Sequence, residues 1–241
     1  MPITVTAVPC LSDNYAWLLR APDGRLAVCD PGEAAPIAAA VEAAGGRLDL
    51  ILLTHHHGDH VDGVGELVRR YGAKVMGAAA DAHRLPALDV AVAPGQTAEV
   101  LGVPAEVLAS DGHTRGHIAF NFPECGILLC GDTLFSLGCG RLLEGTAEEM
   151  FASLARLAAL PAETLVCCGH EYSESNARFA LTVEPDNAAL RARADEIARQ
   201  RAEGQPTVPT TIGQELATNP FLRAKDVATL ARIRAAKDSF R

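Results

Sequence analysis

Hydrophobic residues in the first two thirds of the chain gather in short runs, some continuous and some alternating with polar residues, bounded by Gly, Pro and Asp. Runs of this length between turn-forming residues are typical of β-strands. The predicted strands are Ile3 to Val8, Tyr15 to Arg20, Leu26 to Cys29, Leu48 to Leu53, Lys74 to Met76, Ala105 to Leu108, Ile118 to Phe122, Ile127 to Cys130 and Thr164 to Cys167. The pattern therefore predicts that sheets dominate this part of the chain.

Helical segments lie between some of these strands. Ala34 to Ala44 and Gly63 to Tyr71 are two of them. A third begins at Thr146, which forms a capping-box pattern with Glu149, and it stops before Pro161. The mixture of strands and helices predicts sheets with helices outside them, in the α/β (α+β) class.

After His170 the strand pattern fades and helices take over. The predicted helices are Ser173 to Val183, Asn187 to Glu203 and Asp226 to about Lys237. The segment Gly204 to Pro220 is rich in Thr, Pro and Gly and is predicted to be a connecting loop. We therefore expect a domain of residues 1–171 and a smaller helical domain of residues 172–241.

The composition is that of a globular protein, with 49% hydrophobic and 21% charged residues among 241. The net charge of −9 argues against a broad nucleic-acid or anionic-membrane surface, which would need a basic field. The seven cysteines form an odd set without CxxC pairs, so we expect buried reduced thiols. Met1 to Cys10 does not resemble a signal peptide and no run has membrane-spanning length, so we expect the cytosol.

The run from Thr54 to His60, THHHGDH, carries the clearest chemistry. His55 and His57 are two apart on extended backbone, so they point the same way and can share one metal ion. Gly58 lets the chain turn, so that Asp59 and His60 can face a second position close by. Imidazole and carboxylate together suit zinc, iron or manganese. The run therefore predicts half of the ligands for two metal ions.

Two metal ions need more ligands than this run supplies. His113, Asp132 and His170 each lie where a predicted strand becomes a loop, as the first cluster does. A single His or Asp at a strand end is more often a helix or turn cap, but the incomplete coordination favours all three as ligands.

The other histidines fit the site less well. His56 should face away from the ligands and be structural, and His117 should lie behind the ligands or in the packing. His83 has no supporting context.

Together these residues resemble the metallo-β-lactamase superfamily, whose motif is THxHxDH followed by a separate His, a bridging Asp and a final His. The resemblance implies an αββα sandwich and two divalent metal ions, most simply Zn²⁺, with Fe or Mn as alternatives. It assigns His55, His57 and His113 to one metal, Asp59, His60 and His170 to the other, and Asp132 as the bridge. Class B β-lactamases typically use Cys in place of that Asp, so antibiotic hydrolysis is disfavoured.

Further segments resemble glyoxalase II, the hydroxyacylglutathione hydrolases. They are Gly131 to Phe135, Gly138 to Arg141, Glu144 to Thr146, Gly169 to Tyr172, Asn219 to Arg223 and Lys237 to Asp238. The resemblance covers nearly the whole chain. It implies a thioesterase of methylglyoxal detoxification, which hydrolyses S-(2-hydroxyacyl)glutathione, typically S-D-lactoylglutathione, to D-lactate and glutathione. Separately, we expect a monomer. Asp59 would also orient the metal-bound hydroxide.

In that family the helical C-terminal domain helps to bind glutathione. By similarity Arg141, Tyr172, Arg234 and Lys237 would contact it, which is sensible because its carboxylates favour Arg and Lys. Leu143 stands where many members have an aromatic residue, so one contact to glutathione is expected to be missing.

Two other functions share the motif. Glutathione-persulfide dioxygenases use one iron on the same fold, but they need fewer metal ligands and lack the helical extension. A non-catalytic or RNA-processing relative is the other alternative, and the acidic charge and complete ligand set count against it.

Overall fold

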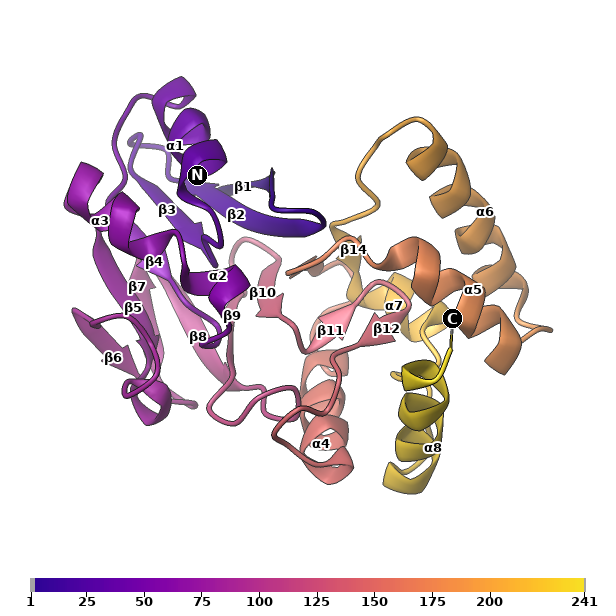
Figure 1. Cartoon of the computed structure of the whole chain (residues 1–241). Coiled ribbons are helices and arrows are strands. Elements are labelled where there is room, and N and C mark those ends of the chain that lie inside the picture. Colours follow the sequence, from indigo (N-terminus) through magenta and orange to yellow (C-terminus); the bar gives the residue numbers. More distant parts are fainter. Residues whose placement is uncertain (1–2, 241) are drawn as a thin grey trace. The chain divides into compact units, whose positions relative to one another are not determined.

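A computed structural model describes residues 3–240, which form two compact units (Figure 1). The first unit contains the residues up to Ala109 and the segment Gly116–Gly131. The second contains Ser110–Arg115 and the chain from Asp132 onward.

The first unit contains a six-stranded sheet whose strands follow their order in the sequence. They are β1 (Thr4–Cys10), β2 (Asn14–Arg20), β3 (Leu26–Cys29), β4 (Leu50–Leu52), β5 (Lys74–Ala78) and β6 (Val90–Val92). The first three strands are antiparallel, and the pairs from β3 to β6 are parallel. Parallel neighbours need crossover connections, and α1 (Ala34–Ala43) and α3 (Val64–Tyr71) lie in two of them.

Apolar side chains bury both faces of this sheet. Ile37 of α1 and Leu67 of α3 belong to one buried cluster with Val28 and Ile51 of the strands. The alternate strand positions, such as Leu52, are equally inaccessible to solvent. A sheet buried on both faces is expected within a layered sandwich.

A second set of strands in this unit runs antiparallel in the order β10, β9, β8, β7. They are β7 (Thr97–Val100), β8 (Val103–Ala109), β9 (Ile118–Phe122) and β10 (Ile127–Gly131). The turn from β7 to β8 consists of Leu101 and Gly102 at φ of 54° and 84°, a geometry that suits a two-residue hairpin. Strands β6 and β7 were not predicted from the sequence.

The second unit is mainly helical. Its helices are α4 (Ala147–Ala158), α5 (Ser173–Val183), α6 (Ala188–Ala202), α7 (Ile212–Thr218) and α8 (Val227–Asp238). Its short strands are β11 (Leu134–Phe135), β12 (Gly138–Cys139), β13 (Leu165–Cys168) and β14 (Thr210–Thr211). Strands β11 and β12 form a hairpin, and β13 pairs with β14.

The predicted helices of this unit are confirmed. The capping box at Thr146 and Glu149 is present at the start of α4. The prediction of a loop from Gly204 to Pro220 was wrong, because β14 and α7 lie inside it. Helix α7 has only seven residues, too few to be stable without tertiary contacts.

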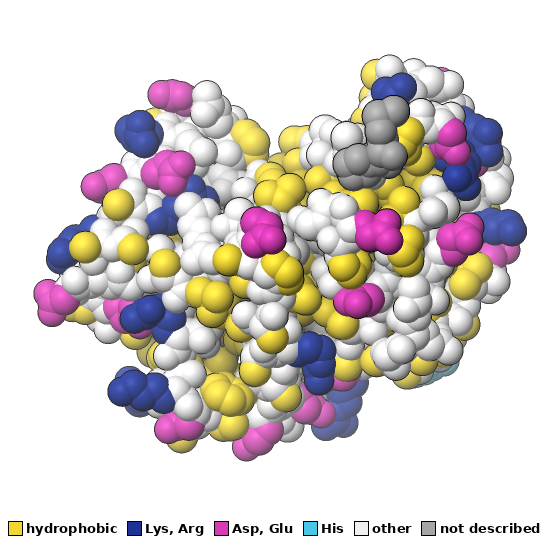
Figure 2. Space-filling model, turned by 180° about the vertical axis from the view of Figure 1, so that it is seen from behind, with side chains coloured by type: hydrophobic (Ala, Val, Ile, Leu, Met, Phe, Trp, Pro, Cys, Tyr) yellow, Lys and Arg dark blue, Asp and Glu magenta, His cyan; other side chains and the backbone are white. Residues whose placement is uncertain are grey.

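On the face shown in Figure 2, Lys and Arg side chains are dispersed among Asp and Glu rather than gathered in one patch. Among residues 3–240, no helix combines the length and the apolar composition needed to cross a bilayer.

Candidate metal centre

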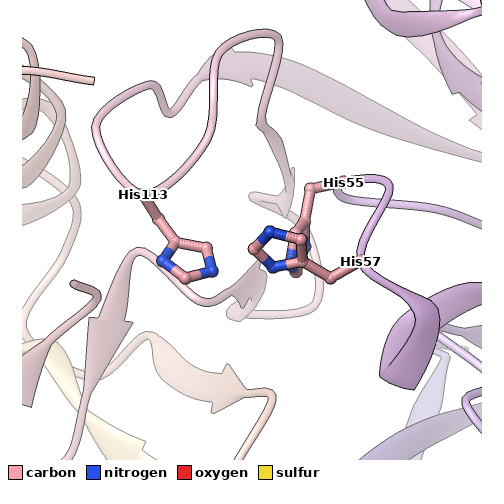
Figure 3. Close-up of side chains that lie close together, drawn as sticks. All are labelled: His55, His57 and His113. Atoms are coloured by element: carbon pink, nitrogen blue, oxygen red, sulfur yellow. The ribbon is translucent and has the colours of Figure 1, made fainter. Parts of the chain in front are cut away.

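In the first unit the histidine run leaves the end of strand β4. His55 and His57 turn to the same side of the extended segment, as Figure 3 shows. His55 Nε2 lies 3.1 Å from His57 Nδ1, and the two ring centroids are 4.7 Å apart. The alternation predicted from the sequence therefore brings these two imidazoles together.

The chain then turns into the short helix α2 (Gly58–Val61), which carries Asp59 and His60. The His60 ring is buried, with its centroid 4.2 Å from that of His55. Asn14 Nδ2 donates to Asp59 Oδ2 at 3.0 Å, while the Asp59 side chain stays 40% exposed. Asp59 is thus held in place and still accessible from solvent.

Asp30 is a site residue that sequence reasoning missed. It is buried and accepts hydrogen bonds from Thr54 N at 2.8 Å and Thr54 Oγ1 at 2.7 Å. Its Oδ2 also lies 3.1 Å from His60 Nδ1. Because a carboxylate oxygen accepts, Nδ1 carries the proton and Nε2 is left for a metal. The one available signal was its place directly after the strand Leu26 to Cys29.

One ligand atom each of Asp30, His55 and His60 lies within 4.8 Å of the other two. Asp30 already accepts from Thr54 and from His60 Nδ1, so it orients the imidazole, whereas the imidazole nitrogens of His55 and His60 fit a divalent metal ion. The first unit therefore has the donor atoms expected of half of a metal centre.

The remaining histidines of this unit have other contacts. His56 Nδ1 lies 2.9 Å from Asp81 Oδ2, and Asp81 also accepts from Arg84 Nε. His117 is buried and stacks on His55, with ring centroids 4.7 Å apart. His83 is exposed.

Two glycines allow the loop after β3 to approach the ligand helix closely. A Cβ atom on Gly32 would lie 1.9 Å from the carbonyl oxygen of Asp59. A Cβ atom on Gly63 would lie 2.5 Å from the carbonyl oxygen of Pro31. The backbone around α2 is therefore packed too closely for a side chain at either position.

The second unit brings together the other three predicted ligands. Asp132 Oδ2 lies 3.5 Å from His113 Nε2 and 3.3 Å from His170 Nε2, and all three residues are buried. His113 is drawn in Figure 3 on its loop, Ser110–Arg115. Its Nδ1 donates to the carbonyl oxygen of Arg141 at 2.9 Å, so its Nε2 is available to a metal.

An aromatic group flanks His170. The Tyr172 ring stacks on the imidazole of His170 with centroids 4.5 Å apart and planes at 5°. Phe135 packs edge-on against both rings. Tyr172 is still 38% exposed, so its outer side can contact a ligand.

The basic residues predicted to bind glutathione differ in exposure. The Arg141 side chain is 64% exposed, with Asp238 at 3.4 Å. Arg234 is buried, donates to the carbonyl oxygen of Cys139 at 2.8 Å and forms an ion pair with Asp238 at 2.7 Å. The guanidinium of Arg234 thus supports the protein's own backbone.

Lys237 is half-buried, and its Nζ donates to the Ser175 carbonyl at 3.1 Å and to Ser175 Oγ at 2.8 Å. Burial, followed by the positive charges of Arg234 and Arg178, lowers the pKa of Lys237 to about 8. Leu143, at the position that departs from the family pattern, is 59% exposed.

Comparisons with known proteins agree with this architecture. Residues 12–170 match the metallo-beta-lactamase superfamily, and residues 171–240 match the hydroxyacylglutathione hydrolase C-terminus. The chain is 57% identical to a hydroxyacylglutathione hydrolase of Acidiphilium cryptum, over 98% of this chain and 97% of that protein. It is 53% identical to the Ruegeria pomeroyi hydroxyacylglutathione hydrolase over the full length of both.

A solved structure supports the fold. The crystal structure of ETHE1 from Myxococcus xanthus superposes with a TM-score of 0.71 at 24% identity, over 98% of this chain and 90% of that one. The predicted α/β fold with a metallo-β-lactamase sandwich and a helical C-terminal part is thereby confirmed. The chain therefore belongs to the hydroxyacylglutathione hydrolases of the metallo-β-lactamase superfamily, and it is a metal-dependent hydrolase.

Proposed function

We propose that this protein hydrolyses the thioester of S-(2-hydroxyacyl)glutathiones, with S-D-lactoylglutathione as the expected substrate and D-lactate and glutathione as products. One observation carries the proposal: each unit brings together imidazole and carboxylate groups that could hold a metal ion, in a chain 57% identical to a hydroxyacylglutathione hydrolase. The proposed ligands are His55, His57, Asp59 and His60 in the first unit and His113, Asp132 and His170 in the second.

The proposed assignment uses two divalent metal ions. One is held by His55, His57 and His113, the other by Asp59, His60 and His170, and Asp132 is shared. The donor chemistry favours Zn²⁺ and also accommodates Fe or Mn. When bound, such ions supply a water of lowered pKa and a Lewis acid for the thioester carbonyl.

The protein's own groups prepare the attack. Asp59 is held by Asn14 and open to solvent. It accepts a hydrogen bond from the attacking water, which orients a lone pair of the water oxygen towards the carbonyl carbon. The water oxygen bonds to the carbonyl carbon as its proton passes to solvent, the C–S bond breaks, and the sulfur leaves as a thiolate. A thiolate is a good leaving group, so no strong general acid is required.

The glutathione part of the substrate is assigned to the second unit. Lys237 and the exposed Arg141 offer positive charge to its carboxylates, and Tyr172 offers a partly exposed ring. Arg234 is the third proposed cation. Because it already forms an ion pair with Asp238, its role is more structural than that of Arg141 or Lys237.

The test is a thioesterase assay on the full chain with measured metal content. With two metal ions per chain, we expect S-D-lactoylglutathione to be hydrolysed and no oxygen to be consumed with glutathione persulfide. A loaded enzyme that consumes oxygen with the persulfide and leaves the thioester intact would instead be the iron-dependent persulfide dioxygenase. Inactivity towards both substrates would also contradict the proposal.

We further propose a monomer that works in the reducing cytosol. The seven cysteines form no disulfide bond in the described residues, and burial raises the pKa of the Cys139 thiol to about 11 and that of Cys168 to about 12. Such thiols are poor nucleophiles at neutral pH. Light scattering of the purified protein tests the monomer, and fractionation of its native cells tests the compartment.

A further inference from the structure

The β11–β12 hairpin lies between two residues that bear on the proposed metal centre. Asp132 comes two residues before β11, and Arg141 comes two residues after β12. Gly140 N donates to the carbonyl oxygen of Thr133 at 3.2 Å, so the two ends of the hairpin are joined. Since the Arg141 carbonyl accepts from His113 Nδ1, the path of this hairpin sets the positions of two proposed ligands.

Side chains from three helices or their ends hold the hairpin by its backbone, and Figure 1 shows α5, α7 and α8 beside it. The carbonyl oxygens of Phe135 and Gly138 accept from Asn219 at 3.1 and 3.0 Å, that of Ser136 from Asn176 at 3.0 Å, and that of Cys139 from Arg234 at 2.8 Å. Each partner lies in the C-terminal helical segment, so this segment determines the hairpin's course.

Glu215 of α7 holds the turn of the hairpin. Leu137, in that turn, has a φ of 58°, in the left-handed region that a residue with a side chain rarely adopts. Its N–H donates to Glu215 Oε2 at 2.8 Å. This hydrogen bond stabilises the turn in a left-handed conformation that is unfavourable for leucine.

The carboxylate of Glu215 has no contact with solvent. Besides Leu137 N it accepts from Asn219 Nδ2 at 2.9 Å and from Thr210 Oγ1 at 2.9 Å. A buried carboxylate is stabilised by such donors and becomes costly when they are removed. Neither the proposed metal ligands nor the glutathione contacts include it, so its burial needs another reason.

We propose that Glu215 is a positioning residue for the metal centre: through Leu137 and Asn219 it fixes the hairpin whose ends carry Asp132 and orient His113. This inference rests on the proposed function, because it takes Asp132 and His113 as metal ligands. It gives the helical segment a task in metal binding in addition to substrate binding. Outer groups that orient metal ligands typically affect metal affinity or activity by about 10- to 100-fold.

The test compares Glu215→Ala and Glu215→Gln with the wild-type full chain. Metal affinity is measured by chelator competition with Zn²⁺, and the ligand arrangement is followed by the visible spectrum of the Co²⁺-substituted protein. We expect Glu215→Ala to bind one metal about 10-fold more weakly or worse, to change the cobalt spectrum, and to lower kcat more than it raises KM. Glu215→Gln keeps one acceptor oxygen, so its metal affinity should lie between those of Glu215→Ala and the wild type.

Glu184→Gln is the matched control. Its carboxylate lies in the same segment, at the end of α5, and accepts from Arg223 and Asn187, neither of which bonds the hairpin. We expect wild-type metal affinity and spectrum from this variant.

Wild-type affinity and an unchanged cobalt spectrum in Glu215→Gln would overturn the inference, even if the variant unfolds more easily. If Glu215→Ala does not fold, Glu215→Gln decides alone. A wild-type protein that binds two metals but leaves S-D-lactoylglutathione intact would contradict the proposed function, whereas the comparison of metal affinities would still stand.

Discussion

The two units supply their proposed metal ligands in different ways. In the first, the four ligands lie in one short segment between β4 and α2 and in α2 itself; they are His55, His57, Asp59 and His60. In the second, His113, Asp132 and His170 come from three segments that are far apart in the sequence and meet only in the folded unit. The first set is a local motif, and the second is a product of tertiary structure.

The supports of the two ligand sets differ accordingly. His60 is oriented by one buried side chain, Asp30, which is also bound to the backbone of Thr54. His113 is oriented by a main-chain carbonyl, and that carbonyl follows a hairpin held by the C-terminal helices. A substitution near the first set should therefore disturb one ligand at a time. A substitution in the C-terminal helices should disturb the second set through the hairpin.

The largest effect is expected from removing Asp132, the proposed shared ligand. Asp132→Ala should lower kcat/KM by about 100-fold or more and leave about one metal ion per chain. Metal analysis of the dialysed protein together with the thioesterase assay measures both. Asp195→Ala, at an exposed position of α6, is the control and should match wild type. Two tightly bound metals in Asp132→Ala would remove Asp132 from the ligand set.

Asp30→Asn tests the support of the first set. The amide cannot accept from Thr54 N, Thr54 Oγ1 and His60 Nδ1 as the carboxylate does, so metal affinity should drop by about 10-fold. Asp49→Asn is the control, because Asp49 also accepts from a backbone N–H, that of Leu26, without contacting a histidine of the run. Equal zinc affinity in the two variants would show that Asp30 has no role in ligand orientation.

Lys237 provides a test through pH. Burial lowers its pKa to about 8, so it is charged below this pH and loses its charge as the pH rises through 8. If it binds a glutathione carboxylate, KM should increase above pH 8 by about 10-fold, the value of a charged hydrogen bond. Lys237→Arg keeps its charge and should move this increase to higher pH. An identical pH profile of KM in the variant would exclude Lys237 from substrate binding.

The same shift has a consequence for stability. The pKa of Lys237 in the folded chain lies below its ordinary value of 10.5, so the folded state disfavours the charged form. This lysine should therefore make the protein more stable as the pH rises from about 8 to 10.5.

The smallest effect is expected from a helix cap away from the ligands. Thr146→Ala removes the capping box of α4 and should lower the free energy of unfolding by about 1 kcal/mol. Denaturant titration measures this loss. Metal content and kcat/KM should stay at wild-type values, and a change in either would mean that general stability and the metal centre are coupled in the second unit.

The sequence was most informative where structure is local. The alternation of His55 and His57 and the helices α5, α6 and α8 follow from short-range periodicity, and the structure agrees with them. His113, Asp132 and His170 could be chosen only because the first run needed more ligands. Their approach to one another depends on how distant segments pack, which no local pattern specifies.

The elements that the sequence did not reveal depend on tertiary contacts. Helix α7 is short and contains Gly213, and the hydrogen bond from Leu137 of the hairpin to Glu215 helps to stabilise it. Asp30 could not be told from an ordinary turn residue, because its role comes from His60, which is distant in the sequence. Buried polar residues that join separate segments are thus the part of a site that composition and periodicity miss.

The glycine at position 32 limits how this protein can change through evolution. Even alanine there would place a carbon atom 1.9 Å from the main chain of Asp59, so the loop and the ligand helix would have to separate. No single substitution at this position can be neutral while the helix keeps its place. A protein descended from this one could carry a side chain at position 32 only after a compensating change in α2. Position 32 and the residues of α2 should therefore coevolve.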